Sequence, residues 1–131
     1  MKLYKDKNIE FRFDIGGDIL VVKFLNEHPV FSETAQFTGA IELINAKRIL
    51  LDLSVVKDFS SDAKELLIED LTKQLMGHGV RKLAILKSPN DKINSFIEQI
   101  IKEKQPPRLK IRFFDTYSDA TVWLKDNYSK D

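Results

Sequence analysis

The chain has no cysteine, which excludes disulfide bonds, thiolate metal ligands and a cysteine nucleophile. It has only two histidines, His28 and His78, and they are too far apart in the sequence to form a paired zinc-ligand motif. Basic and acidic side chains nearly balance, at 21 against 20, so no overall charge favours nucleic acid. We therefore predict no metal, no cofactor and no nucleic-acid partner.

Long apolar runs are also missing. No segment approaches the roughly 18 apolar residues that a membrane-spanning helix needs. The opening "MKLYKDKNIEFRFD" lacks the continuous apolar stretch of a signal peptide. The sequence thus predicts a cytoplasmic protein without a membrane span, and its 131 residues fit a single domain over residues 1–131.

The residues that are present predict five strands. Residues 9–14 alternate apolar and polar side chains, "GGD" at 16–18 marks a tight turn, and "ILVVKFL" follows, so these segments predict a β-hairpin. The apolar run within "KRILLDLSVV" predicts a strand that is buried on both faces. "KLAIL" and "LKIRFF" predict two further strands.

Helical spacing marks four segments between and after these strands. Apolar residues recur at this spacing in "FTGAIELIN", in the segment after residue 62 and in the segment after Ser88. Gly77 or Gly79 is expected to end the second helix. The third helix is expected to begin with Ser88 as its cap and Pro89 in its first turn. Thr116 and Asp119 predict a capping pair for the last helix, whose docking residues are Ala120, Trp123 and Leu124.

The predicted order is β-β-α-β-α-β-α-β-α, an α/β fold with one mixed, mostly parallel sheet whose first strand is antiparallel. In such sheets, working residues gather beyond the carboxyl ends of the parallel strands. That position is expected for residues 26–29, 54–61, 88–92 and 115–118. Ser, Thr and Asp there are able to favour an anion at a helix start, or to serve only as helix caps.

The stretch "DFSSDAKELL" at 58–67 is the main candidate for a binding surface. Ser60 and Ser61 stand between Asp58 and Asp62, where a predicted strand gives way to a predicted helix. They are either caps of that helix or part of a switch. Phe59 either packs inward or stands out as a contact residue.

The segment "RILLDLSVVKDFSSDAKELL" resembles the STAS domain of anti-sigma-factor antagonists. The resemblance extends over roughly residues 8–126, through "KLAIL" to the ending "RFFDTYSDATVWL". In that family, a serine in the loop after this strand is phosphorylated by a partner kinase, and it corresponds here to Ser61. Ser60 occupies the position of the family's aspartate, Asp62 that of a second serine or threonine, and Ala63 that of a glycine. The chain is therefore most similar to the divergent SpoIIAA-like branch.

The resemblance implies a non-enzymatic regulatory module that binds a protein partner, such as an anti-sigma kinase, through residues 54–67. Asp58, Phe59, Ser60, Ser61 and Asp62 are the expected contact residues, with Ser61 as the candidate phosphorylation site. The fold also resembles lipid-carrying CRAL-TRIO domains, which implies an alternative role as a carrier of an apolar ligand near Phe31, Phe37 and Phe96. The sequence places no Ser, His and Asp in triad geometry, so we expect no catalytic residues.

Overall fold

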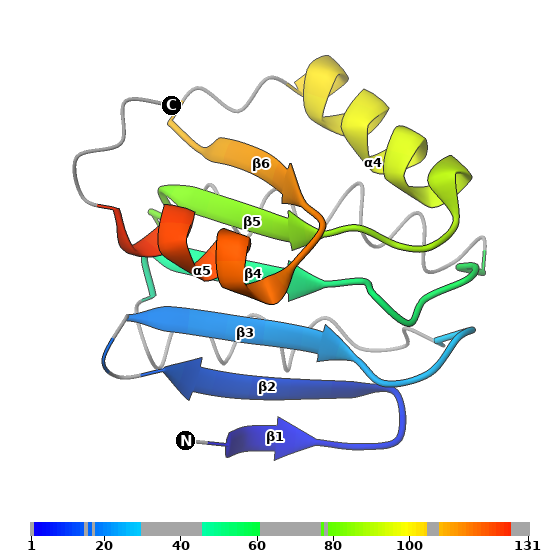
Figure 1. Cartoon of the computed structure of the whole chain (residues 1–131), viewed down its shortest axis with the longest axis horizontal. Helices are drawn as coiled ribbons and strands as arrows, with labels where there is room; N and C mark the ends of the chain where they lie inside the picture. The colour runs from blue at the N-terminus through cyan, green and yellow to red at the C-terminus, as the bar shows by residue number, and fades with distance from the viewer. Residues whose placement is uncertain are drawn as a thin grey trace.

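The computed structural model describes residues 2–14, 16, 18–29, 46–60, 77, 79–104 and 108–126. Over these residues the chain is an α/β protein with one mixed six-stranded sheet and two helices (Figure 1). The strands lie in the sheet in the order in which they occur along the chain. They are β1 (Lys2–Lys5), β2 (Ile9–Asp14), β3 (Ile19–Phe24), β4 (Arg48–Asp52), β5 (Lys82–Leu86) and β6 (Lys110–Phe114).

The pairs β1–β2 and β2–β3 are antiparallel, whereas β3, β4, β5 and β6 are joined by parallel pairs. The predicted hairpin is confirmed, since β2 and β3 pair from Ile9 with Phe24 to Asp14 with Ile19. Asp18 in its turn has a φ of 53°, a left-handed conformation that Asp tolerates better than most residues. The parallel pairs bring the carboxyl ends of β3 to β6 to one end of the sheet, which positions the candidate site.

One face of the sheet packs against α4 (Asp91–Lys104) in what we call the α4-side core. Alternate residues of β2 to β5 supply it, among them Phe11, Phe24 and Ile49, because successive side chains of a strand point to opposite faces. The predicted helical stripe is confirmed, since Ile93 and Ile97 are buried in this core. The core also takes up Val56 and Phe59 from the segment that follows β4.

The opposite face packs against α5 (Tyr117–Lys125) in a smaller cluster, the α5-side core. The predicted docking residues Ala120, Trp123 and Leu124 are buried there. The predicted cap is also confirmed, because the Thr116 hydroxyl accepts a hydrogen bond from the Asp119 backbone N–H at 3.1 Å. In Figure 1, α5 crosses this face in front of β4 and β5.

The described structure differs from the predicted fold in one additional strand and in the start of the third predicted helix. The sheet has a further strand, β1, which pairs with β2 through a bulge between Lys2 and Tyr4. The third predicted helix begins at Asp91, after Asn90, whose side-chain oxygen accepts the Lys92 N–H at 3.0 Å. Asn90, not Ser88, therefore makes the cap contact, and Pro89 lies before the helix.

Other expectations fall partly outside the described residues. Two predicted helices, one between β3 and β4 and one between β4 and β5, fall almost entirely outside the described residues. His78 also falls outside them. Gly79 has a φ of +72°, which confirms the expected left-handed conformation at one of the two candidate glycines. No helix within the described ranges has the length and apolar character needed to cross a membrane.

Candidate interaction site at the carboxyl ends of the parallel strands

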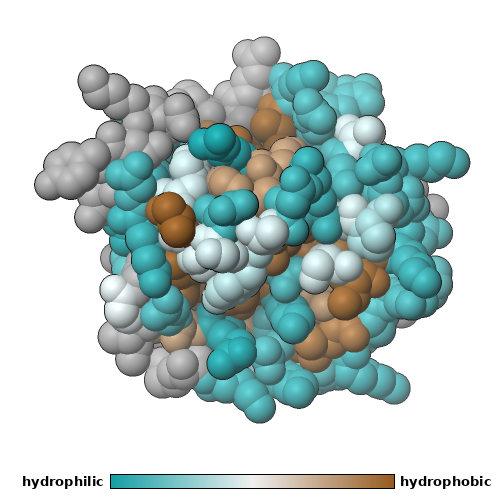
Figure 2. Space-filling model, in the orientation of Figure 1, coloured by the Kyte–Doolittle hydropathy of each residue, from teal (hydrophilic) through white to brown (hydrophobic). Residues whose placement is uncertain are grey.

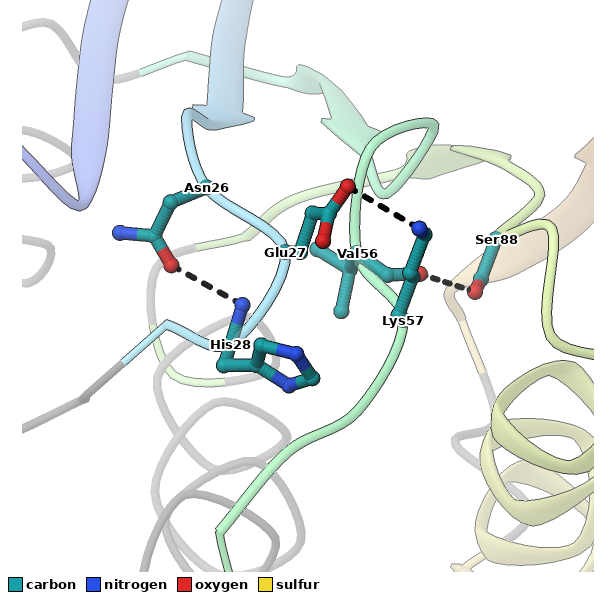
Figure 3. Close-up of polar contacts among 6 residues, drawn as sticks. All are labelled: Asn26, Glu27, His28, Val56, Lys57 and Ser88. Atoms are coloured by element: carbon teal, nitrogen blue, oxygen red, sulfur yellow. Dashed lines mark hydrogen bonds and ion pairs between the residues drawn. The ribbon is translucent and has the colours of Figure 1, made fainter.

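The loops that follow β3, β4 and β5 meet at one end of the sheet, and we call their residues 25–29, 53–60 and 87–90 the rim. Figure 3 shows the centre of the rim, where Glu27 and His28, Val56 and Lys57, and Ser88 come from the three loops. The rim overlaps three of the four stretches at which the sequence predicted working residues, 26–29, 54–61 and 88–92, and the fourth, 115–118, follows β6. We call its second loop, residues 53–60 after β4, the middle loop.

The backbone of the middle loop is hydrogen-bonded on both sides. On the β3 side, the carbonyl oxygen of Glu27 accepts the N–H of Lys57 at 2.8 Å and that of Asp58 at 3.2 Å. On the β5 side, the Asn90 side-chain amide donates to the Lys57 carbonyl oxygen at 2.8 Å. The main chain at Lys57 and Asp58 therefore has partners in both neighbouring loops although it belongs to no strand.

Ser88 is the buried polar residue of the rim. Its hydroxyl donates to the Val56 carbonyl oxygen at 2.5 Å and accepts the Asn90 N–H at 3.0 Å. Asn94 of α4 completes this corner, because its side chain accepts the Ser88 N–H at 2.9 Å and donates to the Ser88 carbonyl oxygen at 2.8 Å. The start of α4 is thereby fastened to the middle loop.

Side chains of the middle loop divide into anchors and exposed groups. Val56 is fully buried and Phe59 is 4% exposed, and the Phe59 ring meets that of Phe24 edge to face at 5.6 Å. Of the two alternatives for Phe59, the structure therefore shows inward packing, and we correct its assignment as a contact residue. The exposed residues of the loop are Ser54, Val55, Lys57, Asp58 and Ser60.

The exposed side chains are chemically mixed. Val55 is 38% exposed, one of three large hydrophobic residues with substantial exposure in the described structure. Lys57 and Glu27 form an exposed ion pair at 3.1 Å, which contributes little to stability at such exposure. Figure 2 shows hydrophobic surface beside hydrophilic surface on the side of the molecule where β3 and β4 end. The rim thus presents both kinds of contact to a partner.

The β1–β2 turn lies beside the rim and is bonded to it through Asn26. The Asn26 side-chain amide donates to the Lys7 carbonyl oxygen at 3.1 Å and to the Asn8 side-chain oxygen at 2.6 Å, and its own oxygen accepts the His28 N–H at 3.0 Å. Asp6 closes this turn. Partial burial raises the pKa of Asp6, but hydrogen bonds from Tyr4, Asn8 and Ile9 outweigh that effect and hold the pKa below its ordinary value.

The predicted contact residues have different positions relative to this site. Asp58 and Ser60 are exposed at the end of the middle loop, whereas Ser61 and Asp62 lie outside the described residues. Asp58 accepts the Phe59 N–H with its side-chain oxygen at 2.9 Å. His28 is exposed at the neighbouring loop.

Sequence reasoning missed the residues that hold the rim together. Asp52, only 7% exposed, accepts the Ser54 N–H at 2.9 Å and so shapes the first turn after β4. Asn90 and Asn94 also hold the rim, through their bonds to Lys57 and Ser88, and sequence reasoning singled out neither of them. The contact of Glu27 is made by its main chain and leaves no signal in the sequence.

A row of charged residues crosses the sheet just inside the rim. Glu10, Lys23 and Asp52 are paired neighbours on β2, β3 and β4, and both carboxylate residues are buried. No group of three or more His, Asp or Glu side chains within the described residues is arranged to hold a metal ion.

Comparison of the chain with protein-family models, with curated proteins and with solved structures gave no significant match.

Proposed function

We propose that this protein is a non-enzymatic regulatory module that binds a protein partner through residues 54–67. The observation that carries the proposal is the construction of the middle loop. Its backbone is held by Glu27 and Asn90, and its anchors Val56 and Phe59 are buried. An irregular loop held in one conformation loses little conformational entropy when it binds, which favours recognition.

The exposed residues of this loop suit a protein surface. Val55 offers an apolar contact, and Lys57, Asp58 and Ser60 surround it with charge and hydrogen-bonding groups. Protein interfaces combine such an apolar centre with a polar rim. The resemblance of the preceding strand and loop to STAS domains supports the anti-sigma-factor-antagonist class, with an anti-sigma kinase or related regulator as the partner in the cytoplasm.

The test is affinity capture from the source organism with quantitative mass spectrometry, comparing Val55→Asp with the matched control Val122→Asp. Val122 lies on α5 and is 68% exposed, so its substitution introduces the same charge away from the rim. We expect Val55→Asp to lose a partner that the wild type and Val122→Asp retain. If both variants capture the same proteins as the wild type while remaining folded, the middle loop is not the contact surface.

The phosphorylation switch is a separate part of the proposal and rests on Ser61. A phosphate there would add about −1.5 to −2 charges close in sequence to Asp58, so its main effect is expected on partner affinity. Capture with Ser61→Asp and Ser61→Ala tests this. Identical partners and amounts for both variants would remove the switch and leave the interaction module in place.

The apolar-ligand carrier stays a prediction. Of its three aromatic residues, Phe96 is half-buried and packs against the α4-side core, and Phe31 and Phe37 lie outside the described residues. Native mass spectrometry of protein purified from its own host tests it directly. A mass equal to that of the chain alone counts against a retained ligand.

A further inference from the structure

β6 is the last strand of the sheet, and no strand of the described structure pairs with its outer edge. The hydrogen bonds to β5 identify which groups point outward. The Lys110 N–H donates to Arg81, and the Phe114 carbonyl oxygen accepts from Lys87. Because the N–H and C=O of one residue point to the same side of a strand and alternate along it, those of Ile111 and Phe113 point away from β5.

The side chains of β6 follow an equally regular pattern. Lys110 and Arg112 are exposed on the face that carries α5, with the Arg112 guanidinium 5.4 Å from the ring of Phe114. Ile111 and Phe113 are half-buried on the other face and pack against the α4-side core. The edge therefore offers cations on one face and apolar side chains on the other.

The opposite edge of the sheet lacks this regularity. β1 has four residues and a bulge between Lys2 and Tyr4, and short or bulged edge strands resist the addition of another strand. β6, in contrast, pairs with β5 over all five residues without a shift in register. Lysine on an edge strand commonly protects against aggregation, so Lys110 alone does not indicate a binding site. The regular pairing of β6 is what distinguishes it from β1.

We propose that β6 accepts an extended segment of a partner protein as an added strand, and that this segment alternates acidic and apolar residues. The outward N–H and C=O groups of Ile111 and Phe113 would bind its main chain. Its acidic side chains would lie opposite Lys110 and Arg112, where opposite charges on paired strands attract, and its apolar side chains would extend the α4-side core. Strand addition of this kind combines main-chain affinity with side-chain selectivity. The proposal does not depend on the middle loop of the rim.

The test uses blocked synthetic peptides and amide hydrogen exchange read by NMR. The first peptide alternates glutamate and valine. The second replaces each valine with proline, which keeps the charge but prevents strand pairing, because proline lacks the backbone N–H. The third replaces each glutamate with lysine. We expect binding of the first peptide only, with slowed exchange at the amides of Ile111 and Phe113.

Two double variants complete the design. Lys110→Glu with Arg112→Glu should weaken the first peptide by about tenfold, since two cross-strand pairs change from attraction to repulsion. Lys2→Glu with Lys5→Glu makes the same charge change at the β1 edge and should leave the affinity unchanged. If the first double variant unfolds, the milder Lys110→Gln with Arg112→Gln replaces it, with a smaller loss expected.

Two results would overturn the proposal. Equal binding of the glutamate–valine and glutamate–proline peptides would show that the charge of the peptide alone determines binding, without strand pairing. The second result is no binding of the glutamate–valine peptide at millimolar concentration, with the amides of Ile111 and Phe113 unprotected. Lys110 and Arg112 would then serve only to prevent aggregation at this edge.

Discussion

The two ends of the parallel strands use polar residues in different ways. At the carboxyl ends, side chains such as Ser88, Asn90 and Asn26 bond to main-chain groups of neighbouring loops. At the amino ends, the three strands β4, β5 and β6 begin with Arg48, Lys82 and Lys110, paired side by side in register. The first arrangement fixes loops, whereas the second places cations along the sheet.

This difference predicts where the protein is sensitive to substitution. Loops held by buried anchors and buried hydrogen bonds lose stability when an anchor is removed. Cations that solvent still reaches contribute less, because water screens them and replaces part of their contacts. Substitutions at the rim should therefore cost more than substitutions at the amino ends.

The largest effect is expected at the apolar anchor of the rim. Phe59→Ala should lower the free energy of unfolding by about 3 kcal/mol, because it leaves a cavity beside Phe24 that the loop fills only in part. Urea unfolding measures the loss as a lower midpoint at an unchanged slope. A loss below about 1 kcal/mol would mean that the middle loop is not anchored by this ring.

The buried hydroxyl of Ser88 should have the next largest effect. Ser88→Ala removes the donor to the Val56 carbonyl oxygen and leaves that buried acceptor without its partner, which should cost about 2 kcal/mol. Ser54→Ala is the control, because Ser54 is exposed in the same loop and its loss should stay within about 0.5 kcal/mol. Equal losses at the two serines would contradict the distinction between buried and exposed polar groups at the rim.

Asp6 provides a pH-dependent test of the β1–β2 turn, which lies beside the rim and is bonded to it through Asn26. Its pKa is held below the ordinary value by Tyr4, Asn8 and Ile9, so the ionised side chain stabilises the folded state. That stability is complete above the pKa of the unfolded chain, about 3.9, and is lost as the pH falls through the folded pKa.

Asp6→Asn should therefore lower the free energy of unfolding by about 1 kcal/mol at neutral pH, and the difference from the wild type should shrink in acid. Urea unfolding over a pH series measures both quantities. Asp115→Asn is the control, since Asp115 is exposed and makes an ion pair with Lys87 at 3.4 Å. A deficit at Asp6 that persists unchanged in acid would refute a stabilising role for the charge.

The sequence predicted those elements that strong patterns mark. The alternation in β2, the apolar run of β4 and the stripe of Ile93 and Ile97 in α4 each correspond to a described element. β1 was not predicted, because its four residues, with a lysine at each end, show too little alternation of apolar and polar side chains. Such a strand is stabilised by pairing with β2, and pairing partners leave no local signal.

The candidate site was predicted as a region and not as a set of contacts. The position of the rim follows from the order of strands and helices, which local patterns indicate. Ser88 stood out as a polar residue before a helix, but whether it caps that helix or bonds to Val56 depends on a loop far away in the sequence. The inward packing of Phe59 likewise depends on Phe24 of β3.

The smallest effect is expected at the amino ends, where Lys82 lies over the last turn of α5. Its ammonium donates to the carbonyl oxygens of Trp123 at 2.9 Å and Asp126 at 2.7 Å, and it lies 4.9 Å from the centre of the Trp123 ring. A cation at a helix carboxyl end contributes modestly when solvent reaches it. Lys82→Met keeps the apolar stem and should cost about 0.5 kcal/mol.

Trp123 is the single tryptophan of the chain, so tryptophan fluorescence reports on the surroundings of this residue, which include the Lys82 ammonium. Lys82→Met should shift the emission of the folded protein, whereas Lys125→Met, in the same turn of α5 and ion-paired to Asp14 at 3.7 Å, should leave it unchanged. If Lys82→Met instead costs more than Ser88→Ala, the amino ends are as important to stability as the rim. The contrast between buried contacts at one end of the sheet and partly solvent-exposed cations at the other would then be wrong.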